Sequence, residues 1–378
     1  MSKDVVIAGY VRTPFTFARK GPLATVRPDD LGAHVVRALL ERTGVTPEEI
    51  EDVVWGCAFP EGEQGLNIGR VVGLRAGLPV SSAGMTVNRW CGSSVQAVQV
   101  AAGMVMMGAG EALIAGGCES MSRVPMMGFN ILPPPSWSAE EVSDFINVGL
   151  TAERVAQIHG IGRAEQDAFA HASHSKALAA QRAGRLVDEI APIEVDGRLV
   201  SEDGCIRDTT PEGLAQLKTV FLKEGTVTAG SSSPMTDGAT ALLICTLDFA
   251  EAHGLRPLAR IAGFGVSGCE PGVMGMGPVE SSRKAVARAG LTIADIDVVE
   301  MNEAFASQAE ACRRLLDIDP ARLNIDGGGI AIGHPLGGTG GRLVGKTATL
   351  LQREGGRYGL ATQCIGGGMG IAMVLEAL

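Results

Sequence analysis

One segment of this sequence occurs twice, once early and once late in the chain. Residues 42–51 (RTGVTPEEIE) align with residues 288–297 (RAGLTIADID); apolar residues with helical spacing precede each copy, and a pair of valines follows shortly after it. Each copy therefore predicts a helix, a turn and a strand in succession. A chain that contains this unit twice is expected to fold as two similar halves.

The correspondence continues beyond this unit. In the first half, Cys91 and a helical pattern at residues 93–107 align with a glycine-rich loop at 337–341 and a helical pattern at 343–352 in the second half. The apolar strand after each helical pattern also has a counterpart, and in the second half that strand leads to Cys364. These alternating patterns predict an α/β chain with a site between the halves that draws residues from both.

The region between the halves has a different character. Between residue 117 and about residue 227, Met, Pro and polar residues become frequent and are followed by helical patterns. A long insertion of this kind indicates a lid or ligand-binding loops. We therefore divide the chain into the first part of an N-terminal half, an inserted loop domain, the remainder of that half with further loop segments, and a C-terminal half: residues 1–118, 119–190, 191–248 and 249–378.

Charge and cysteine usage disfavour several classes of protein. The formal charge of −10 over 378 residues would be repelled by phosphate backbones, so nucleic-acid binding is not expected. Eight cysteines occur without a Cys-x-x-Cys pair, and a strand-like run begins at residue 5, so we expect reduced thiols in a cytoplasmic protein without a signal or transit peptide. Glycine or charge interrupts every apolar stretch that could span a bilayer.

One cysteine stands where a strand pattern gives way to a helix. Cys91 follows residues 87–90 (VNRW) and precedes Gly92 and Ser93. The unpaired amides and dipole at a helix N-terminus lower the pKa of a thiol, and the small residues after it let a substrate carbonyl approach the backbone. We therefore predict that Cys91 is a nucleophile and not a buried structural thiol.

One histidine lies in a segment dense in turn residues. His334 is held between glycines and a proline in residues 327–340 (GGGIAIGHPLGGTG), which indicates a backbone shaped to present a base. The other histidines lie in helical or polar stretches and are not expected to be catalytic; they are His34, His159, His171, His174 and His253.

A second thiol follows a strand and enters a glycine turn. Cys364 begins residues 364–370 (CIGGGMG), where side chain and backbone amides are exposed together, and such amides can form an oxyanion hole. Asn302 and Glu303 follow the repeated strand in residues 300–306 (EMNEAFA), which by themselves are typical of a capping motif. No Gly-x-x-x-x-Gly-Lys-Ser/Thr or Rossmann fingerprint supports a nucleotide fold.

Taken in this order, the four segments resemble the thiolase family, and the similarity extends over nearly the whole chain. Thiolases have a nucleophilic cysteine after Val-Asn-Arg, an Asn-Glu-Ala-Phe segment, a Gly-His-Pro loop and a terminal Cys-x-Gly-Gly-Gly turn, and this sequence has all four. The resemblance implies the α/β thiolase fold, in which two similar βαβαβαββ halves form a five-layered αβαβα arrangement with an inserted loop domain.

The resemblance also implies roles for individual residues. Cys91 would accept the acyl group, His334 would activate it, and Cys364 would move a proton to and from the acetyl carbon. Asn302 would hold a water that forms one oxyanion hole with His334, and the amides of Cys91 and Gly366 would form the other. These roles match what cleavage next to a thioester requires, namely a soft nucleophile, an acid for the carbanion and donors for both oxygens.

Contacts to coenzyme A follow from the same resemblance. Ser233 matches the serine that contacts the pantetheine arm, and Arg207 is the nearest match to an arginine near the adenine, although its alignment needs a gap. Val148, Met274 and Phe305 are expected to contact the acyl chain or coenzyme A. Coenzyme A is then a substrate, and no metal or tightly held cofactor is implied, because the cysteines and histidines lack ligand spacing.

The details favour one branch of the family without excluding another. Val148 stands where short-chain biosynthetic members have Met, and residues 91–94, 273–278 and 300–302 are closer to degradative 3-ketoacyl-CoA thiolases (acetyl-CoA C-acyltransferases). Trp90, directly before the nucleophile, would narrow the acyl tunnel and therefore favours the short-chain biosynthetic branch.

We therefore expect thiolytic cleavage of 3-ketoacyl-CoA by coenzyme A to acetyl-CoA and a shortened acyl-CoA. The alternatives are a biosynthetic acetoacetyl-CoA thiolase, a condensing synthase of the same fold, which would lack Cys364, and a catalytically silent lipid-binding protein. A homodimer or homotetramer is expected. Whether a β-oxidation multienzyme partner exists cannot be predicted from these motifs.

Overall fold

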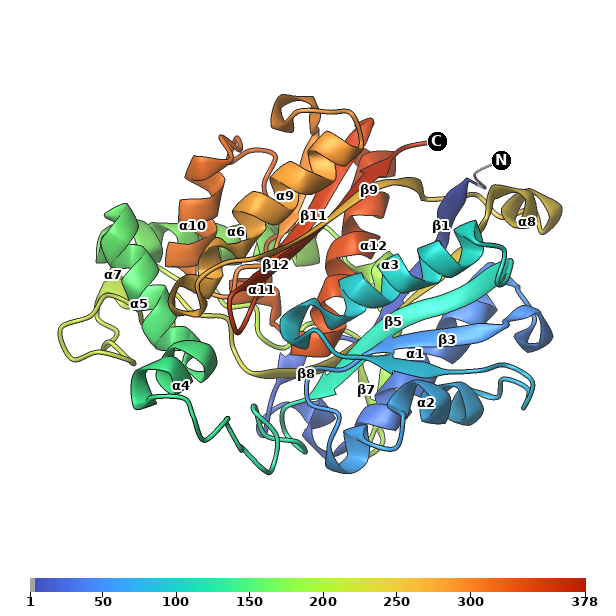
Figure 1. Ribbon diagram of the computed structural model, residues 1–378, viewed down its shortest axis with the longest axis horizontal. Helices are drawn as coiled ribbons and strands as arrows, with labels where there is room; N and C mark the ends of the chain where they lie inside the picture. Colours follow the sequence, from blue (N-terminus) through green and yellow to red (C-terminus); the bar gives the residue numbers. More distant parts are fainter. Residues whose placement is uncertain (1–3) are drawn as a thin grey trace.

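A single mixed sheet runs through the molecule in the computed structural model, which describes residues 4–378 (Figure 1). The strand order along it is β4-β3-β5-β8-β1-β9-β12-β11-β10, and β2 pairs with β8. The strands are β1 (Val5–Arg12), β2 (Thr16–Phe17), β3 (Asp52–Gly56), β4 (Met85–Val87), β5 (Ala112–Ser120), β8 (Thr236–Thr246), β9 (Ala259–Gly268), β10 (Val298–Met301), β11 (Tyr358–Ile365) and β12 (Met369–Glu376).

The strand pairing follows the same pattern in both halves of the chain, as the repeated segment predicted. In the first half β3 is parallel to β4 and β5, whereas β5, β8 and β1 are successively antiparallel. In the second half β10 is parallel to β11, and β11, β12 and β9 are successively antiparallel. The counterpart of β4 is reduced to a parallel bridge between Val299 and Leu323. The halves join where Val6 and Ile7 of β1 pair with Arg260 and Ala259 of β9.

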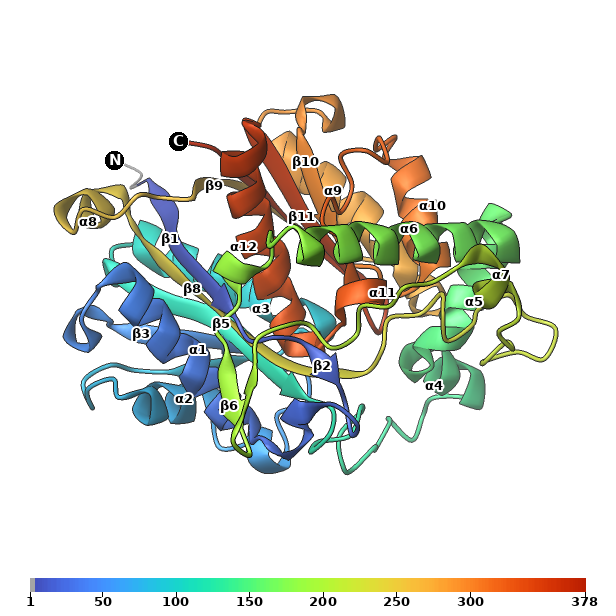
Figure 2. The ribbon, with the colours of Figure 1, turned by 180° about the vertical axis from the view of Figure 1, so that it is seen from behind.

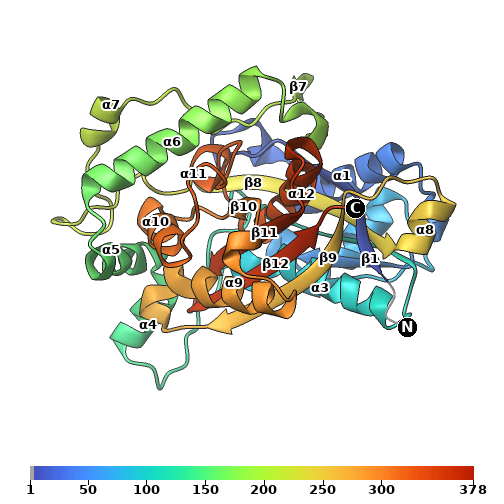
Figure 3. The same ribbon diagram turned by 90° about the horizontal axis from the view of Figure 1, so that it is seen from above.

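Helices pack on the outer face of each half-sheet and between the two half-sheets, which gives the five layers that were predicted (Figure 3). One apolar core lies between α1 and α2 and the first half-sheet, a second between α9 and α10 and the second half-sheet. A third core joins α3 and α12 to strands of both half-sheets, so these two helices form the central layer. The helices are α1 (Pro28–Thr43), α2 (Ile68–Ala76), α3 (Ser93–Met106), α9 (Gly277–Arg288), α10 (Ala306–Leu315) and α12 (Leu336–Glu354).

The turn inside the repeated unit has the same chemistry in both copies. Short 3-10 helices, η2 (Pro47–Glu49) and η7 (Ile293–Asp295), follow α1 and α9. The Glu49 carboxylate accepts a hydrogen bond from the Thr46 amide at 2.8 Å, and the Asp295 carboxylate accepts one from the Thr292 amide at 2.8 Å. An acidic side chain that satisfies an unpaired amide in this way fixes where the next strand begins.

The inserted region packs beside the second half and covers one end of it (Figure 2). Helix α5 contacts α10, and α6 contacts both α10 and α11. Its elements and the remaining short ones are α4 (Ala139–Ile146), α5 (Val148–His159), α6 (Arg163–Arg182), β6 (Ile193–Val195), β7 (Arg198–Val200), α7 (Pro211–Ala215), α8 (Leu247–Ala252) and α11 (Gly329–Ile332).

One prediction about a local element was wrong. Residues 337–341 are not a loop but the first turns of α12, which begins at Leu336. The glycines there allow α12 to approach α3 so closely that a β-carbon at Gly340 would lie 2.6 Å from the Val95 amide nitrogen. Side chains from the first half satisfy the early amides, because Glu119 accepts from Gly337 at 3.0 Å and Ser94 accepts from Gly341 at 2.8 Å. Tertiary packing thus overrides the low helix propensity of glycine.

Within residues 4–378, none of the helices is both long and apolar enough to cross a membrane.

Candidate active site

Cys91 lies in a 3-10 turn, η4 (Trp90–Gly92), that connects β4 with α3. The turn is fixed by side chains on either side of it: Asn88 Oδ1 accepts from the Trp90 amide at 2.9 Å, and Ser93 Oγ donates to the Trp90 carbonyl at 2.6 Å. The Gln363 amide group donates to the Cys91 carbonyl from the second half. The predicted strand-to-helix position of Cys91 is therefore confirmed.

His334 lies between α11 and the start of α12, where it is buried. Its backbone amide donates to Thr236 Oγ1 at 2.8 Å, and its Nδ1 lies 2.6 Å from Thr339 Oγ1. Burial lowers the pKa of His334 to about 3, so the ring is neutral at physiological pH. Thr339 occupies Nδ1, and Nε2 is the ring nitrogen available for proton transfer.

Cys364 lies near the end of β11, before the turn into β12, and its side chain is buried. Gly367 and Gly368 continue this turn with left-handed φ values of 77° and 80°. Burial and then the charge of Cys91 raise the pKa of the Cys364 thiol well above its ordinary value. Two thiols from different halves of the chain are thus close enough to influence each other's ionisation.

The expected low pKa of Cys91 is not what the structure indicates. Burial raises the pKa of its thiol to about 11, against the lowering effect of the Gly366 and Cys91 backbone amides. The helix position does provide stabilising amides, as predicted, but the cost of placing a charge in a dry site is larger. Cys91 therefore rests as a thiol and needs a base at the moment of reaction.

Asn302 directly follows β10 and is fully buried. Neither its Oδ1 nor its Nδ2 has a hydrogen-bond partner among residues 4–378. Burial of an unpaired amide is costly, so its retention here points to a functional partner such as water or substrate. Gly329 leaves room for this side chain, because a β-carbon there would lie 2.7 Å from Asn302 Oδ1.

Three of the predicted binding residues lie together with one of the predicted catalytic thiols. Met274 and Phe305 belong to a buried apolar cluster with Cys364, and Val148 packs against that cluster. The Ser233 amide donates to the carbonyl of Ala304, the residue directly before Phe305, at 2.9 Å. These side chains form an apolar wall beside the Cys364 thiol.

Arg207 is the predicted residue that the structure does not bring into this cluster. It is exposed, its guanidinium lies 4.9 Å from the centre of the Phe17 ring, and its amide donates to His174 Nδ1 at 3.3 Å. An exposed arginine outside this cluster fits a contact to the far end of a long substrate better than a catalytic role.

Several residues that support the site were missed in the sequence. Thr236, Thr339 and Gln363 hold His334 and Cys91 through hydrogen bonds. Thr339 could have been suspected, because it follows His334 by little more than one helical turn. Thr236 could not, since it is 98 residues away from His334 in the sequence.

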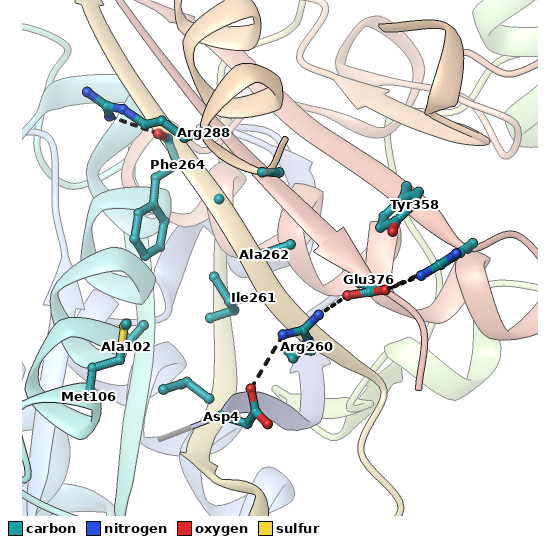
Figure 4. A pocket seen from close by; sticks show the side chains of 14 residues that line it. Asp4, Ala102, Met106, Arg260, Ile261, Ala262, Phe264, Arg288, Tyr358 and Glu376 are labelled. Carbon is teal, nitrogen blue, oxygen red and sulfur yellow. Dashed lines mark hydrogen bonds and ion pairs between the residues drawn. The ribbon is translucent and has the colours of Figure 1, made fainter. Parts of the chain in front are cut away.

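The molecule also has a cavity away from these residues. It measures about 450 Å³ and lies between α3, β9 and the ends of the chain, where Arg260 bonds to Glu376 and Asp4 and Arg288 donates to the Phe264 carbonyl (Figure 4). None of the predicted site residues lines it. Across residues 4–378, no group of three or more His, Cys, Asp or Glu side chains could hold a metal ion.

The fold and the site define a class of protein: an acyl-transfer enzyme built from two repeated halves, with two cysteine thiols and a neutral histidine as its candidate reactive groups. Models of known families agree with this. The model of the thiolase N-terminal domain matches residues 5–248, and that of the thiolase C-terminal domain matches residues 255–377. The chain belongs to the thiolase family.

Relatives and solved structures match along the full length. The 3-ketoacyl-CoA thiolase of Bacillus subtilis (strain 168) is 45% identical over 99% of this chain and 99% of the relative. That of Vibrio vulnificus (strain CMCP6) is also 45% identical, with the same coverage of both chains. The human mitochondrial 3-ketoacyl-CoA thiolase has a TM-score of 0.92 at 38% identity, covering 99% of both chains. A structure of that human enzyme in complex with CoA has the same TM-score and identity and covers 100% of this chain and 98% of the human chain.

Proposed function

We propose that this protein cleaves 3-ketoacyl-CoA with coenzyme A to give acetyl-CoA and an acyl-CoA shortened by two carbons. The observation that carries the proposal is a set of three groups: the half-buried thiol of Cys91, the buried thiol of Cys364 and the neutral ring of His334. The printed name of the bacterial and human relatives, 3-ketoacyl-CoA thiolase, supports the same substrate class.

The first half-reaction breaks the bond between C2 and C3 of the substrate. His334 Nε2 takes the proton of Cys91, and the thiolate attacks the C3 keto carbon. The amides of Cys91 and Gly366 stabilise the oxygen of that carbon, while His334 and a water on Asn302 stabilise the enolate oxygen of the departing acetyl-CoA. Cys364 gives its proton to the acetyl carbon, and the acyl group remains on Cys91 as a thioester.

The second half-reaction regenerates both thiols. The thiol of an incoming coenzyme A gives its proton to the Cys364 thiolate and attacks the acyl group on Cys91. The Cys91 thiolate leaves and recovers the proton held by His334. No oxidant, reductant or metal is consumed, because each proton that leaves one group is returned by another.

Coenzyme A is proposed to bind along the inserted region. Ser233, beside the wall of Val148, Met274 and Phe305, suits the pantetheine arm, and the exposed guanidinium of Arg207 suits the adenine end. The human relative solved in complex with CoA supports coenzyme A as the ligand.

The assembly and location are proposals of the same kind. A homodimer or homotetramer is supported by β4, an edge strand of half-buried residues whose open side could pair with another copy. A cytoplasmic location is supported by the cysteines, all eight of which are free thiols.

The decisive experiment measures thiolysis of acetoacetyl-CoA and longer 3-ketoacyl-CoA substrates by wild type, Cys91→Ala and Cys364→Ala. We expect thiolysis by wild type, loss of at least about 10³-fold in both variants, and an acyl group on Cys91 detected by mass spectrometry. Thiolysis that survives Cys364→Ala would favour a condensing synthase, and failure of Cys91 to become acylated would favour a silent lipid-binding protein. Activity on acetoacetyl-CoA alone would favour the biosynthetic branch.

A further inference from the structure

The indole of Trp90 is held rigidly beside the nucleophile. Trp90 has a left-handed backbone, with φ of 43°, which a bulky residue adopts only when its surroundings enforce it. The bonds from Asn88 and Ser93 described above supply that enforcement. Trp90 and Cys91 also pack against the same apolar cluster, which contains Phe59. The ring therefore forms part of the wall around Cys91 and cannot swing away freely.

The same indole also covers the turn that contains Gly366, whose amide is proposed to form an oxyanion hole with that of Cys91. A β-carbon at Gly366 would lie 2.6 Å from Trp90 Cε3 and 3.7 Å from Val148 Cγ1, so Trp90 and Val148 both lie close to Gly366. Phe145 covers the next residue, since a β-carbon at Gly367 would lie 2.9 Å from its ring. An acyl chain that leaves Cys91 across Gly366 meets the indole.

Behind Trp90 the wall continues as a series of aromatic contacts. The Trp90 and Phe145 rings meet edge to face with centroids 5.2 Å apart, and Phe145 meets Trp137 in the same way at 4.9 Å. The Phe59 ring also lies near the indole, with centroids 6.2 Å apart. Phe145 lies on α4, and Asp144 beside it forms an ion pair with Arg154 of α5 at 2.8 Å. Edge-to-face pairs add stabilisation beyond their apolar area, so these contacts restrain the indole.

We propose that Trp90, backed by Phe145, is a specificity-determining residue that restricts the enzyme to short, straight 3-ketoacyl chains of about four to six carbons. The proposal rests on the thiolase function proposed above and names its substrate class. A longer chain has to displace an indole whose backbone, neighbours and ring contacts are all constrained. Leucine at this position would leave space for several methylene groups.

The test compares kcat/KM for acetoacetyl-CoA, 3-ketohexanoyl-CoA and 3-ketodecanoyl-CoA in wild type, Trp90→Leu and Phe145→Leu. We expect wild type to lose about tenfold or more in kcat/KM between the six-carbon and ten-carbon substrates. Trp90→Leu should raise the ratio of ten-carbon to four-carbon activity by about tenfold, and Phe145→Leu should raise it by less. Phe129→Leu, an exposed residue of the same inserted region, is the matched control and should leave the ratio unchanged.

Two results would overturn the assignment: a wild type that prefers the ten-carbon substrate, or a ratio that Trp90→Leu and Phe145→Leu both leave unchanged. Using two variants on different elements guards against one that does not fold, and acylation of Cys91 by acetyl-CoA in each variant reports an intact site. Failure of the proposed function is distinguishable, because wild type would then cleave none of the three substrates.

Discussion

At the scale of single residues, the site keeps its reactive groups uncharged until substrate arrives. The pKa of Cys91 is raised to about 11, and that of His334 is lowered to about 3, in both cases because burial disfavours the charged form. A thiolate and imidazolium pair is therefore not present beforehand, and in the proposed mechanism proton transfer from Cys91 to His334 accompanies attack. Such a site limits side reactions of the thiolate, since it is formed only with a substrate in place.

This arrangement predicts how Cys91 responds to pH. With a raised pKa, the fraction of thiolate is small at pH 7 and increases through pH 10, so alkylation of the free enzyme by iodoacetamide should accelerate continuously over that range. The rate is measured on the Cys91 peptide by mass spectrometry, in a Cys364→Ala background that removes the second thiol. A plateau below pH 8 would mean that the thiolate is formed in advance.

Asn302 and Asn324 provide a matched pair of buried amides. Asn302 makes no hydrogen bond within residues 4–378, whereas Asn324 accepts from the Met301 amide at 2.9 Å and donates to the Met301 carbonyl at 2.9 Å and to Glu303 at 2.7 Å. Asn302→Ala should lower kcat/KM by about 100-fold and the free energy of unfolding by about 1 kcal/mol or less. Asn324→Ala should lower the free energy of unfolding by about 2–4 kcal/mol.

Thiolysis assays and urea unfolding of both variants check this contrast. If Asn302→Ala lost as much stability as Asn324→Ala, the Asn302 side chain would be structural and its proposed role in holding water would be wrong.

The candidate catalytic residues stand out in the sequence, and the residues that hold them in place do not, for a physical reason. Cys91, His334 and Cys364 stand in short glycine-rich segments whose local chemistry is visible in the sequence. Thr236 and Gln363 act on residues of other segments, so only the folded chain reveals them. The direction of the Cys91 pKa shift was mispredicted because a helix terminus is a local feature, whereas burial depends on the whole fold.

At the scale of elements, the central layer depends on glycine at the contact of α3 with α12. A β-carbon at Gly340 of α12 would lie 2.5 Å from Val95 Cγ2 and 2.6 Å from the Val95 backbone nitrogen, whereas one at Gly103 of α3 would meet no atom within 4 Å among the described residues. The two positions therefore separate helix propensity from helix packing.

We expect opposite effects from the same substitution at these positions. Gly103→Ala should raise the free energy of unfolding by about 0.5–1 kcal/mol, because alanine favours the helix. Gly340→Ala should lower it by about 1–3 kcal/mol, because the backbone of α3 has to move, and it should also lower activity since α12 begins beside His334. Urea unfolding and thiolysis assays measure both. A stabilised Gly340→Ala would contradict the close packing.

Helices and strands could be predicted where the sequence pattern of the element itself determines its structure. The helix, turn and strand of the repeat were correctly expected because an apolar helical pattern precedes each copy and a pair of valines follows it. The first turns of α12 were not, because glycine has low helix propensity and the partners Glu119 and Ser94 come from the first half. The four-part division of the chain stays a prediction.

At the scale of the whole molecule, a buried ionic network links the halves, the inserted region and the catalytic segments. Arg12 of β1 pairs with Glu189 and Asp203 at 2.7 Å each, and Lys346 of α12 pairs with Glu189 at 3.0 Å and with Asp326 at 2.7 Å. Burial opposes ionisation of Glu189, but Lys346 and Arg12 outweigh it and hold its pKa at about 2. This carboxylate stabilises the fold above its ordinary pKa, and that stability is lost as the pH falls towards 2.

One member of the network behaves in the opposite way. Glu300, two residues before Asn302, is buried 3.2 Å from Arg342, yet neither of its oxygens makes a hydrogen bond within residues 4–378. Burial raises its pKa to about 7, against the attraction of Arg342 and Lys346. A carboxyl whose pKa is raised by folding favours the folded state in its protonated form, so its contribution is complete below pH 4.5 and is lost as the pH rises through 7.

Glu300→Gln is therefore expected to make the protein less sensitive to alkaline pH. Between pH 5 and pH 8, the free energy of unfolding of wild type should fall relative to that of Glu300→Gln by about 2–3 kcal/mol, because the glutamine carries no charge that must be buried. Urea unfolding at both pH values measures this difference, and Glu280→Gln, an exposed carboxylate on α9, serves as the control that should follow wild type. If wild type and Glu300→Gln changed in parallel, Glu300 would be fully ionised in the folded protein at both pH values, and Arg342 would compensate its charge completely. If they diverge as expected, the charge near Asn302 changes with pH around 7, because Glu300 lies on β10, which ends directly before the residue proposed to hold the oxyanion water.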